Sequence, residues 1–116
     1  MYNENNIFNK IINGQAHCDK IYEDEKILAF KDAYPRAPIH VLVIPKGEFT
    51  SFVDFISNNT QEEIGYFFKK VKEIAEQLGV EEGGYRLVTN HGKNANQVVP
   101  HFHVHILGGK IFTSDS

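Results

Sequence analysis

The chain has 116 residues, a length that suits a single domain with a modest core, and its 41% hydrophobic and 23% charged residues exclude collagen-like, low-complexity and disordered classes. The net charge of −3 offers no broad basic surface for nucleic acid, and the longest uncharged apolar run, 39–45, is far short of the roughly 20 residues that cross a membrane. One cysteine, Cys18, excludes an internal disulfide and suits a reducing compartment. Residues 1–10 lack a basic region followed by an apolar stretch, so we expect a cytoplasmic protein without nucleic-acid or membrane partners.

Sequence patterns within residues 1–45 predict one helix and three strands. Apolar residues at helical spacing predict a helix within 5–13, which Gly14 ends. Two short strands are expected next, joined by a tight turn, at 20–23 and 26–31. A loop with two prolines follows, and the β-branched run 39–45 predicts a buried strand.

The clearest helix signal covers 60–79. Thr60 and Glu63 match a capping box, an apolar stripe follows at spacings of three and four, and Gly79 is placed to end the helix. Three further segments are expected: a strand over 85–89, a polar loop over 90–97 and a last strand over 101–107. The order of helix, strands, helix, strands with short gaps favours one antiparallel α+β domain over 1–116. An uncovered sheet edge would invite pairing with a second copy.

The last expected strand carries an unusual histidine pattern. Three histidines alternate with three apolar residues: His101, His103 and His105 with Phe102, Val104 and Ile106. Because side chains on a strand alternate with period two, the imidazoles share one face and the apolar groups the other. An exposed polar face would rarely use three histidines. A metal site and nucleophilic or acid–base chemistry both suit clustered imidazoles, and spacing alone does not separate them. Packed imidazoles oppose each other's protonation, which would keep the middle one neutral and nucleophilic.

HFHVH followed by ILGG matches the histidine-triad pattern of alternating histidine and apolar residues. With IFNKIINGQ near the start, the segment 21–46 and GYRLVTNHG, the chain resembles the Hint branch of the histidine-triad (HIT) superfamily over nearly its whole length. The third histidine, His105, argues against the uridylyltransferase branch, which has Gln there. The short length argues against the decapping branch and, less firmly, against the dinucleoside-polyphosphate hydrolase branch.

The resemblance implies a HIT-like fold of five antiparallel strands and two helices, with two subunits pairing into a ten-stranded sheet. It also implies binding of purine nucleoside monophosphates such as AMP. The implied reaction is cleavage of phosphoramidate or acyl-phosphate bonds at the α-phosphorus through a covalent nucleotidyl-histidine. No cofactor is implied.

The resemblance assigns the nucleophile to His103, whose other ring nitrogen a backbone carbonyl would hold. Three more histidines complete the family's set and would orient phosphate oxygens and stabilise charge: His40, His101 and His105. Asp32 matches the residue that binds ribose hydroxyls, and Asn90 matches a contact on the phosphate or leaving-group side. Two positions match the phosphate loop, Gln97 and Val98. The apolar cleft for the base matches Ile7, Phe8, Ile11, Phe30 and Leu42.

The sequence departs from the family in two places. The phosphate loop, usually Gly-Gly-Gln-Ser, reads Ala-Asn-Gln-Val over 95–98, so Val98 can offer phosphate only its backbone N–H. Asn96 reaches positive φ more readily than most residues, so the turn can survive. Asn6 and Asn9 stand where many bacterial relatives have Cys-x-x-Cys of a zinc site, and asparagine is a poor zinc ligand, so we expect no structural metal.

Three hypotheses follow from these patterns. The first is an enzyme, a purine nucleoside phosphoramidase. The second is a nucleotide-binding dimeric module with vestigial hydrolysis, which the altered phosphate loop keeps open. The third is a zinc protein that uses the triad. For the enzyme, attack by a neutral imidazole predicts a rate that falls as pH drops through about 6 to 7.

Overall fold

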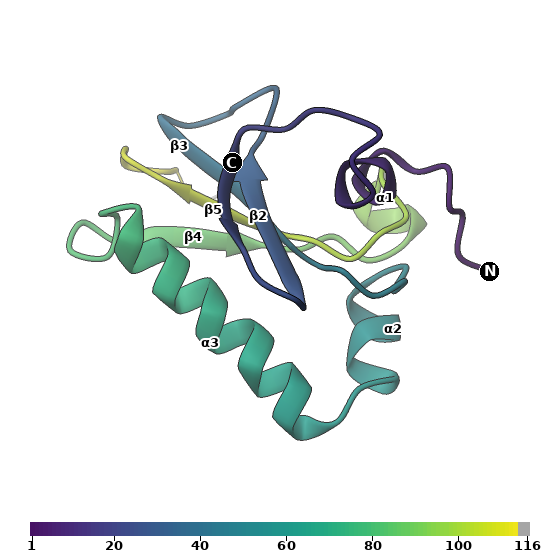
Figure 1. The fold of residues 1–116 in the computed structure, drawn as a ribbon. Helices are drawn as coiled ribbons and strands as arrows, with labels where there is room; N and C mark the ends of the chain where they lie inside the picture. Colours follow the sequence, from purple (N-terminus) through teal and green to yellow (C-terminus); the bar gives the residue numbers. More distant parts are fainter. Residues whose placement is uncertain (114–116) are drawn as a thin grey trace.

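In a computed structural model, which describes residues 1–113, the chain forms a five-stranded antiparallel sheet (Figure 1). The elements in chain order are α1 (Ile7–Ile12), β1 (Lys20–Glu23), β2 (Ile27–Lys31), β3 (Ile39–Pro45), α2 (Phe52–Ser57), α3 (Gln61–Gln77), β4 (Tyr85–Val88), the 3₁₀ turn η1 (Lys93–Ala95) and β5 (Val104–Gly108). The strand order is β1-β2-β3-β5-β4, and every pairing is antiparallel, which confirms the predicted α+β class. None of the helices within residues 1–113 is long and apolar enough to cross a membrane.

One face of the sheet is covered by α2 and α3 (Figure 1). Strand side chains at alternate positions pack there against both helices: Ile27, Ala29, Val41, Val43, Val104 and Ile106 against Phe55, Phe67, Val71 and Ile74. The capping box that begins α3 is confirmed, because Thr60 Oγ1 accepts from the Glu63 N–H at 3.1 Å and the Glu63 carboxylate accepts from the Thr60 N–H at 3.5 Å. Past the end of α3, Gly79 has φ +78°, which glycine tolerates without strain.

The opposite face carries a smaller apolar cluster under α1. Its buried members are Phe8, Leu28, Phe30, Leu42 and Ile44. The two faces of β2 and β3 are both apolar, because helices cover both sides of the sheet. The histidines share the α1 face with this second cluster, since the Phe8 ring lies 5.0 Å from that of His103.

Two elements differ from the sequence predictions. The last strand begins at Val104 instead of residue 101, because the preceding segment bonds elsewhere: the Phe102 N–H donates to the Phe49 carbonyl at 2.8 Å. The alternation of faces nevertheless holds, with Phe102 in the core beside Val104. The six-residue helix α2 has no counterpart in the prediction of two helices. It forms because Phe55 is buried against α3 and Phe102, contacts that come from distant parts of the chain.

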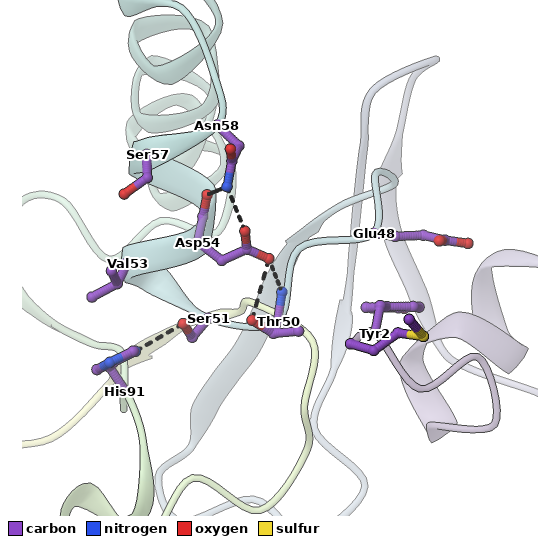
Figure 2. A pocket seen from close by; sticks show the side chains of 10 residues that line it. Tyr2, Glu48, Thr50, Ser51, Val53, Asp54, Ser57, Asn58 and His91 are labelled. Atoms are coloured by element: carbon purple, nitrogen blue, oxygen red, sulfur yellow. Dashed lines mark hydrogen bonds between the residues drawn. The ribbon is translucent and has the colours of Figure 1, made fainter.

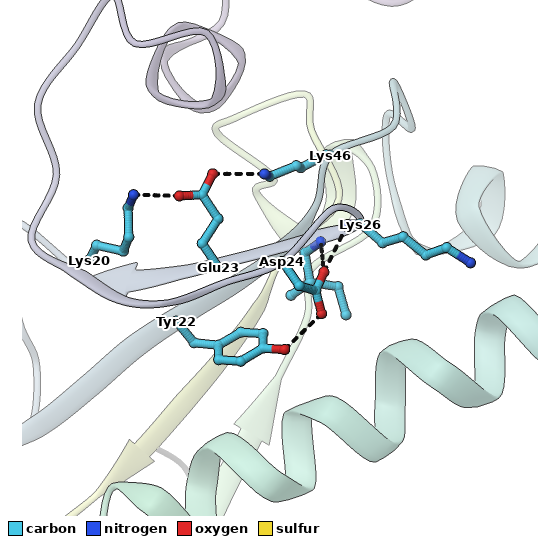
Figure 3. A network of polar contacts seen from close by, with 7 residues as sticks. Lys20, Tyr22, Glu23, Asp24, Lys26 and Lys46 are labelled. Carbon is cyan, nitrogen blue, oxygen red and sulfur yellow. Dashed lines mark hydrogen bonds and ion pairs between the residues drawn. The ribbon is translucent and has the colours of Figure 1, made fainter.

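A polar network closes the β1–β2 turn (Figure 3), and Tyr66 links it to α3. Asp24 Oδ1 accepts from the N–H groups of Lys26 and Ile27, both at 2.8 Å, which closes the turn. Its Oδ2 accepts from the hydroxyls of Tyr22 at 2.8 Å and Tyr66 at 2.5 Å, and Tyr66 lies on α3. This network lies on the α3 side of the sheet, away from the histidines.

Candidate active site

His103 has one ring nitrogen held and one free. Its Nδ1 lies 2.7 Å from the backbone oxygen of His101. Because a carbonyl oxygen can only accept, Nδ1 carries the proton and Nε2 keeps its lone pair. Among the described residues, every side-chain nitrogen or oxygen that is fully buried has a hydrogen-bond partner. Nε2 of His103 has no such partner, so it is not fully buried and reaches solvent. The side chain thus presents an unprotonated nitrogen at the surface of an otherwise buried ring.

His101 is fully buried, and both of its ring nitrogens are used inside the protein. Nε2 lies 2.8 Å from the Pro45 carbonyl oxygen, and Nδ1 lies 2.6 Å from the Tyr2 hydroxyl. Since the carbonyl accepts, Nε2 carries the proton and Nδ1 accepts from the Tyr2 O–H. No ring nitrogen of His101 is left for a phosphate oxygen. The residue reaches the site through its backbone oxygen, which holds His103.

His40 and His105 form a hydrogen-bonded pair in which His40 is the donor. The Arg36 N–H donates to His40 Nδ1 at 3.1 Å, so the proton of neutral His40 is on Nε2. That Nε2–H faces His105 Nδ1 at 2.9 Å and Asp32 Oδ2 at 3.3 Å. His105 Nδ1 therefore accepts, and its proton is on Nε2, which has no partner among the described residues and reaches solvent. His105 therefore presents an N–H donor to solvent, whereas His103 presents a lone pair, and the centroids of the two rings lie 5.1 Å apart.

Burial keeps the triad neutral. Desolvation lowers the pKa of His101 and of His105 to about 4, and electrostatic coupling to the His103 ring lowers each further. Desolvation also lowers the pKa of His103. A neutral His103 was expected from the crowding of imidazoles. Burial is instead the main cause, and for His103 the contact with the His101 carbonyl and the charge of Asp32 act in the opposite direction.

The residues expected in the base cleft are partly gathered. Phe8, Phe30 and Leu42 are buried together in the α1-side cluster, with Ile11 packed on its margin. The Phe8 ring meets that of Phe30 edge-on at 5.6 Å and that of His103 at 5.0 Å, so it joins the apolar cluster to the histidines. Ile7 is half exposed and lies outside this cluster.

The loop expected to bind phosphate is held by Gln97. Its side-chain oxygen accepts from the Gly92 N–H at 3.0 Å, and its amide donates to the carbonyls of Thr50 at 2.7 Å and Val99 at 3.0 Å. These contacts use both donors of the amide, so Gln97 shapes the loop and has no N–H left for a ligand. Asn96 has φ +57°, the left-handed conformation expected for it. Val98 is exposed, and Asn90, expected on the phosphate or leaving-group side, is half-buried where β4 ends.

Among the described residues, Asp32, His40 and His105 offer ligand atoms within 4.8 Å of one another, the spacing of a metal site. A metal on His40 Nε2 would need the lone pair there and the proton on Nδ1. The Arg36 N–H already faces Nδ1, so that tautomer would oppose two donors. The proton pattern of the site favours a hydrogen-bonded chain over a metal centre.

Three contacts of the site escaped the sequence analysis. Tyr2 contacts His101 across 99 positions of sequence, Arg36 acts through its backbone, and the Thr89 hydroxyl donates to the His103 carbonyl at 2.8 Å. No local pattern marks any of them. Tyr2 also lines a pocket of about 520 Å³ shared with Glu48, Asp54 and His91 (Figure 2), and no triad histidine lines it.

Known proteins agree with this geometry. The family model of the HIT domain matches residues 13–111. A HIT-like protein of Rickettsia prowazekii is 50% identical over 110 residues, which cover 95% of this chain and 92% of the relative. Among solved structures, a HIT family hydrolase from Legionella pneumophila has a TM-score of 0.89 and 37% identity, covering 96% of this chain and 98% of that one. A histidine triad nucleotide-binding protein from Candida albicans has a TM-score of 0.77 and 28% identity, covering 96% and 85%.

The match of the family model spans most of the chain, and the histidines that define the family pattern lie together on one face of the sheet. The fold is that of the family's nucleotide-binding hydrolases. The chain belongs to the histidine-triad (HIT) family.

Proposed function

We propose that the protein is a purine nucleoside phosphoramidase of the Hint type, which transfers a nucleoside monophosphate to His103 and then to water. The observation that carries the proposal is the proton pattern of two neighbouring rings. His103 offers a solvent-facing lone pair, and His105, 5.1 Å away, offers a solvent-facing N–H. A nucleophile and a fixed donor side by side are what substitution at a phosphoryl group needs.

In the first step, Nε2 of His103 forms a bond to the α-phosphorus as the phosphorus–nitrogen bond breaks. The amine leaves with its bonding electron pair and takes a proton from water. The phosphorylated imidazole is cationic, and the His101 carbonyl, 2.7 Å from Nδ1, stabilises it. In the second step, water attacks phosphorus and gives up a proton to the solvent, and the bond from phosphorus to Nε2 breaks with its electron pair returning to His103. The neutral pair of His40 and His105 has no spare proton, so its part is to hold a phosphoryl oxygen through the His105 N–H.

Nucleotide binding uses the groups around this centre. The Asp32 carboxylate, whose Oδ1 accepts from the Tyr34 N–H at 2.8 Å, is fixed and has lone pairs left for ribose hydroxyls. The apolar cluster of Phe8, Phe30 and Leu42, with Ile11 and Ile7 at its margin, supports the base. Asn90 and the backbone N–H of Val98 would contact the phosphate or the departing group.

The test is intact-protein mass spectrometry after rapid mixing with adenosine 5′-phosphoramidate and quenching in denaturant. The proposal predicts a transient mass increase of one AMP, which His103→Ala abolishes together with turnover. His17→Ala, at a residue whose side chain is 88% exposed, is the matched control and should keep both. Steady turnover by His103→Ala at the wild-type rate would refute the proposal.

The second candidate is a nucleotide-binding module with vestigial hydrolysis. It is favoured by Val98, which is 80% exposed and brings no hydroxyl to the phosphate loop. Calorimetric binding of AMP with no product from the phosphoramidate over a long incubation would select the module. Product formation that depends on His103 would select the enzyme.

We also propose that the protein is a homodimer. The sheet order leaves β4 at one edge, where Leu87 is 46% exposed and available for a second copy. The opposite edge, β1, carries Lys20 and Glu23, which suits solvent (Figure 3). Light scattering after size exclusion should give twice the mass of the chain, and Leu87→Arg should reduce it to that of one chain.

A further inference from the structure

We propose that Tyr2 is a positioning residue for His103, acting through His101. The inference rests on the proposed function, because it explains how the nucleophile is held for attack. The Tyr2 hydroxyl donates to His101 Nδ1 at 2.6 Å, and the two rings meet edge-on with centroids 5.6 Å apart. His101 in turn holds His103 through its backbone oxygen at 2.7 Å.

The position of the His101 ring depends on Tyr2, because the Tyr2 hydroxyl is the hydrogen-bond partner of Nδ1 and the described residues offer that atom no other. The ring is fully buried, and its Nε2–H is used by the Pro45 carbonyl at 2.8 Å. Without the phenol, Nδ1 would be a buried acceptor with nothing to accept from, which is costly in an apolar surrounding. The Pro45 carbonyl sets the tautomer, and the Tyr2 contact fixes the tilt of the ring. Desolvation raises the pKa of Tyr2, so the phenol stays a donor across the neutral range.

A network of asparagine hydrogen bonds fixes the segment that follows Tyr2. The Asn6 side chain donates to the Asn3 carbonyl at 2.7 Å and accepts from the Asn9 N–H at 2.9 Å as the N-cap of α1. The Asn9 side chain donates to the Glu4 carbonyl at 2.9 Å. Asn6 and Asn9 are both buried, so this short segment is pinned to the start of α1 next to the triad. This network explains why two asparagines are buried although neither takes part in the proposed nucleotide chemistry.

The same helix places an aromatic ring against both histidines. Phe8 lies 6.3 Å from His101 and 5.0 Å from His103, edge-on to each. Loss of the hydroxyl would free His101 to shift, and with it the backbone oxygen that orients the His103 ring. The loss falls on the chemical step. Nucleotide binding relies on Asp32 and the apolar cluster, which Tyr2 does not touch.

Tyr2→Phe removes one oxygen from a half-buried side chain, and it should leave folding intact as checked by circular dichroism. We expect kcat for adenosine 5′-phosphoramidate to fall about fivefold, the size of one lost hydrogen bond, with KM unchanged within about twofold. Tyr22→Phe is the matched control. It removes the same group from the Asp24 network on the other side of the sheet and should leave kcat unchanged. An unchanged kcat in Tyr2→Phe overturns the proposal.

A second readout does not need turnover. Nitrogen-15 NMR of the histidine rings should show neutral His101 with an accepting Nδ1 and His103 with a protonated Nδ1. Tyr2→Phe should shift the His101 Nδ1 resonance and also change the His103 ring signals, whereas Tyr22→Phe should change neither. If the wild type shows no turnover, the proposed function fails while this measurement still tests the link. Unchanged His103 signals in Tyr2→Phe refute it.

Discussion

The burial of neutral histidines predicts that the fold loses stability in mild acid. The pKa values of His101 and His105 are about 4 in the folded chain, against about 6.5 for the ordinary imidazole they resemble when unfolded. Between pH 6.5 and 4 the unfolded chain binds one more proton at each site. The free energy of unfolding therefore falls by about 1.4 kcal/mol per pH unit for each histidine as the pH drops. Across the window each contributes about 3 kcal/mol, a large share of the roughly 5–15 kcal/mol that stabilises a small domain.

The measurement is a series of urea titrations followed by circular dichroism between pH 7.5 and 4.5. His101→Gln keeps a donor for the Pro45 carbonyl and removes the titration, so it should reduce the pH slope by the contribution of one histidine, about 1.4 kcal/mol per pH unit. His17→Gln, at an exposed histidine, is the control and should keep the wild-type slope. Stability that stays constant from pH 7 to 5 would refute the reasoning.

Carboxylates act in a different pH window, which keeps the two effects separable. Hydrogen bonds from Lys20 and Lys46 lower the pKa of Glu23 to about 2 (Figure 3). The pKa of Asp24 also falls to about 2, because hydrogen bonds led by that of Tyr66 outweigh the desolvation that raises it. A depressed carboxyl pKa contributes stability above its unfolded value, near 4, and loses it toward pH 2. Loss above pH 4.5 is therefore assigned to the histidines.

Three further predictions concern rate and stability. The lowered pKa of His103 moves the acid limb of kcat/KM below the ordinary value of about 6.5, and an acid limb at pH 7 or higher would contradict a neutral buried nucleophile. Thr60→Ala removes the cap of α3 and should cost about 1 kcal/mol in urea unfolding with activity unchanged. Asp24→Asn replaces one acceptor oxygen by an NH2 group, so either the backbone N–H groups of the turn or the two tyrosine hydroxyls lose their acceptor. It should cost about 1–3 kcal/mol without altering kcat, and a larger effect on kcat than on stability would place the network in the site.

Local patterns predicted most of the sheet because each strand carries its own signal. The β-branched run 39–45 is β3, and the capping box at Thr60 marks the start of α3. The prediction that fails at 101–103 fails for a non-local reason. Phe102 bonds to Phe49, 53 positions earlier, and this contact takes the segment out of the ladder. The short helix α2 is missed for the same kind of reason, since Phe55 stabilises it through tertiary contacts.

The candidate site was likewise predictable only in part. The alternation of His103 with Val104 placed the histidines on one face, as predicted from the period of a strand. The resemblance implied a backbone carbonyl behind His103, and the His101 carbonyl lies there. The protons on His40 and His101 were beyond prediction, because the N–H of Arg36 and the carbonyl of Pro45 set them. A sequence pattern identifies imidazoles that share a surface, and only the group behind each ring decides what that ring offers.

This dependence explains how four chemically identical side chains can have separate roles in one site. A carbonyl behind His103 leaves a lone pair on its outer nitrogen, the nucleophile of the proposed reaction, whereas the N–H of Arg36 behind His40 leaves a donor on the outer nitrogen of His105. Because the two patterns are opposite, exchanging them would put a proton on the nitrogen proposed to attack and a lone pair against the phosphoryl oxygen in that proposal. The backbone around the histidines therefore constrains the chemistry as strongly as the histidines themselves. It follows that a substitution that keeps all four imidazoles can still abolish the proposed activity if it moves a backbone group that holds one of the rings.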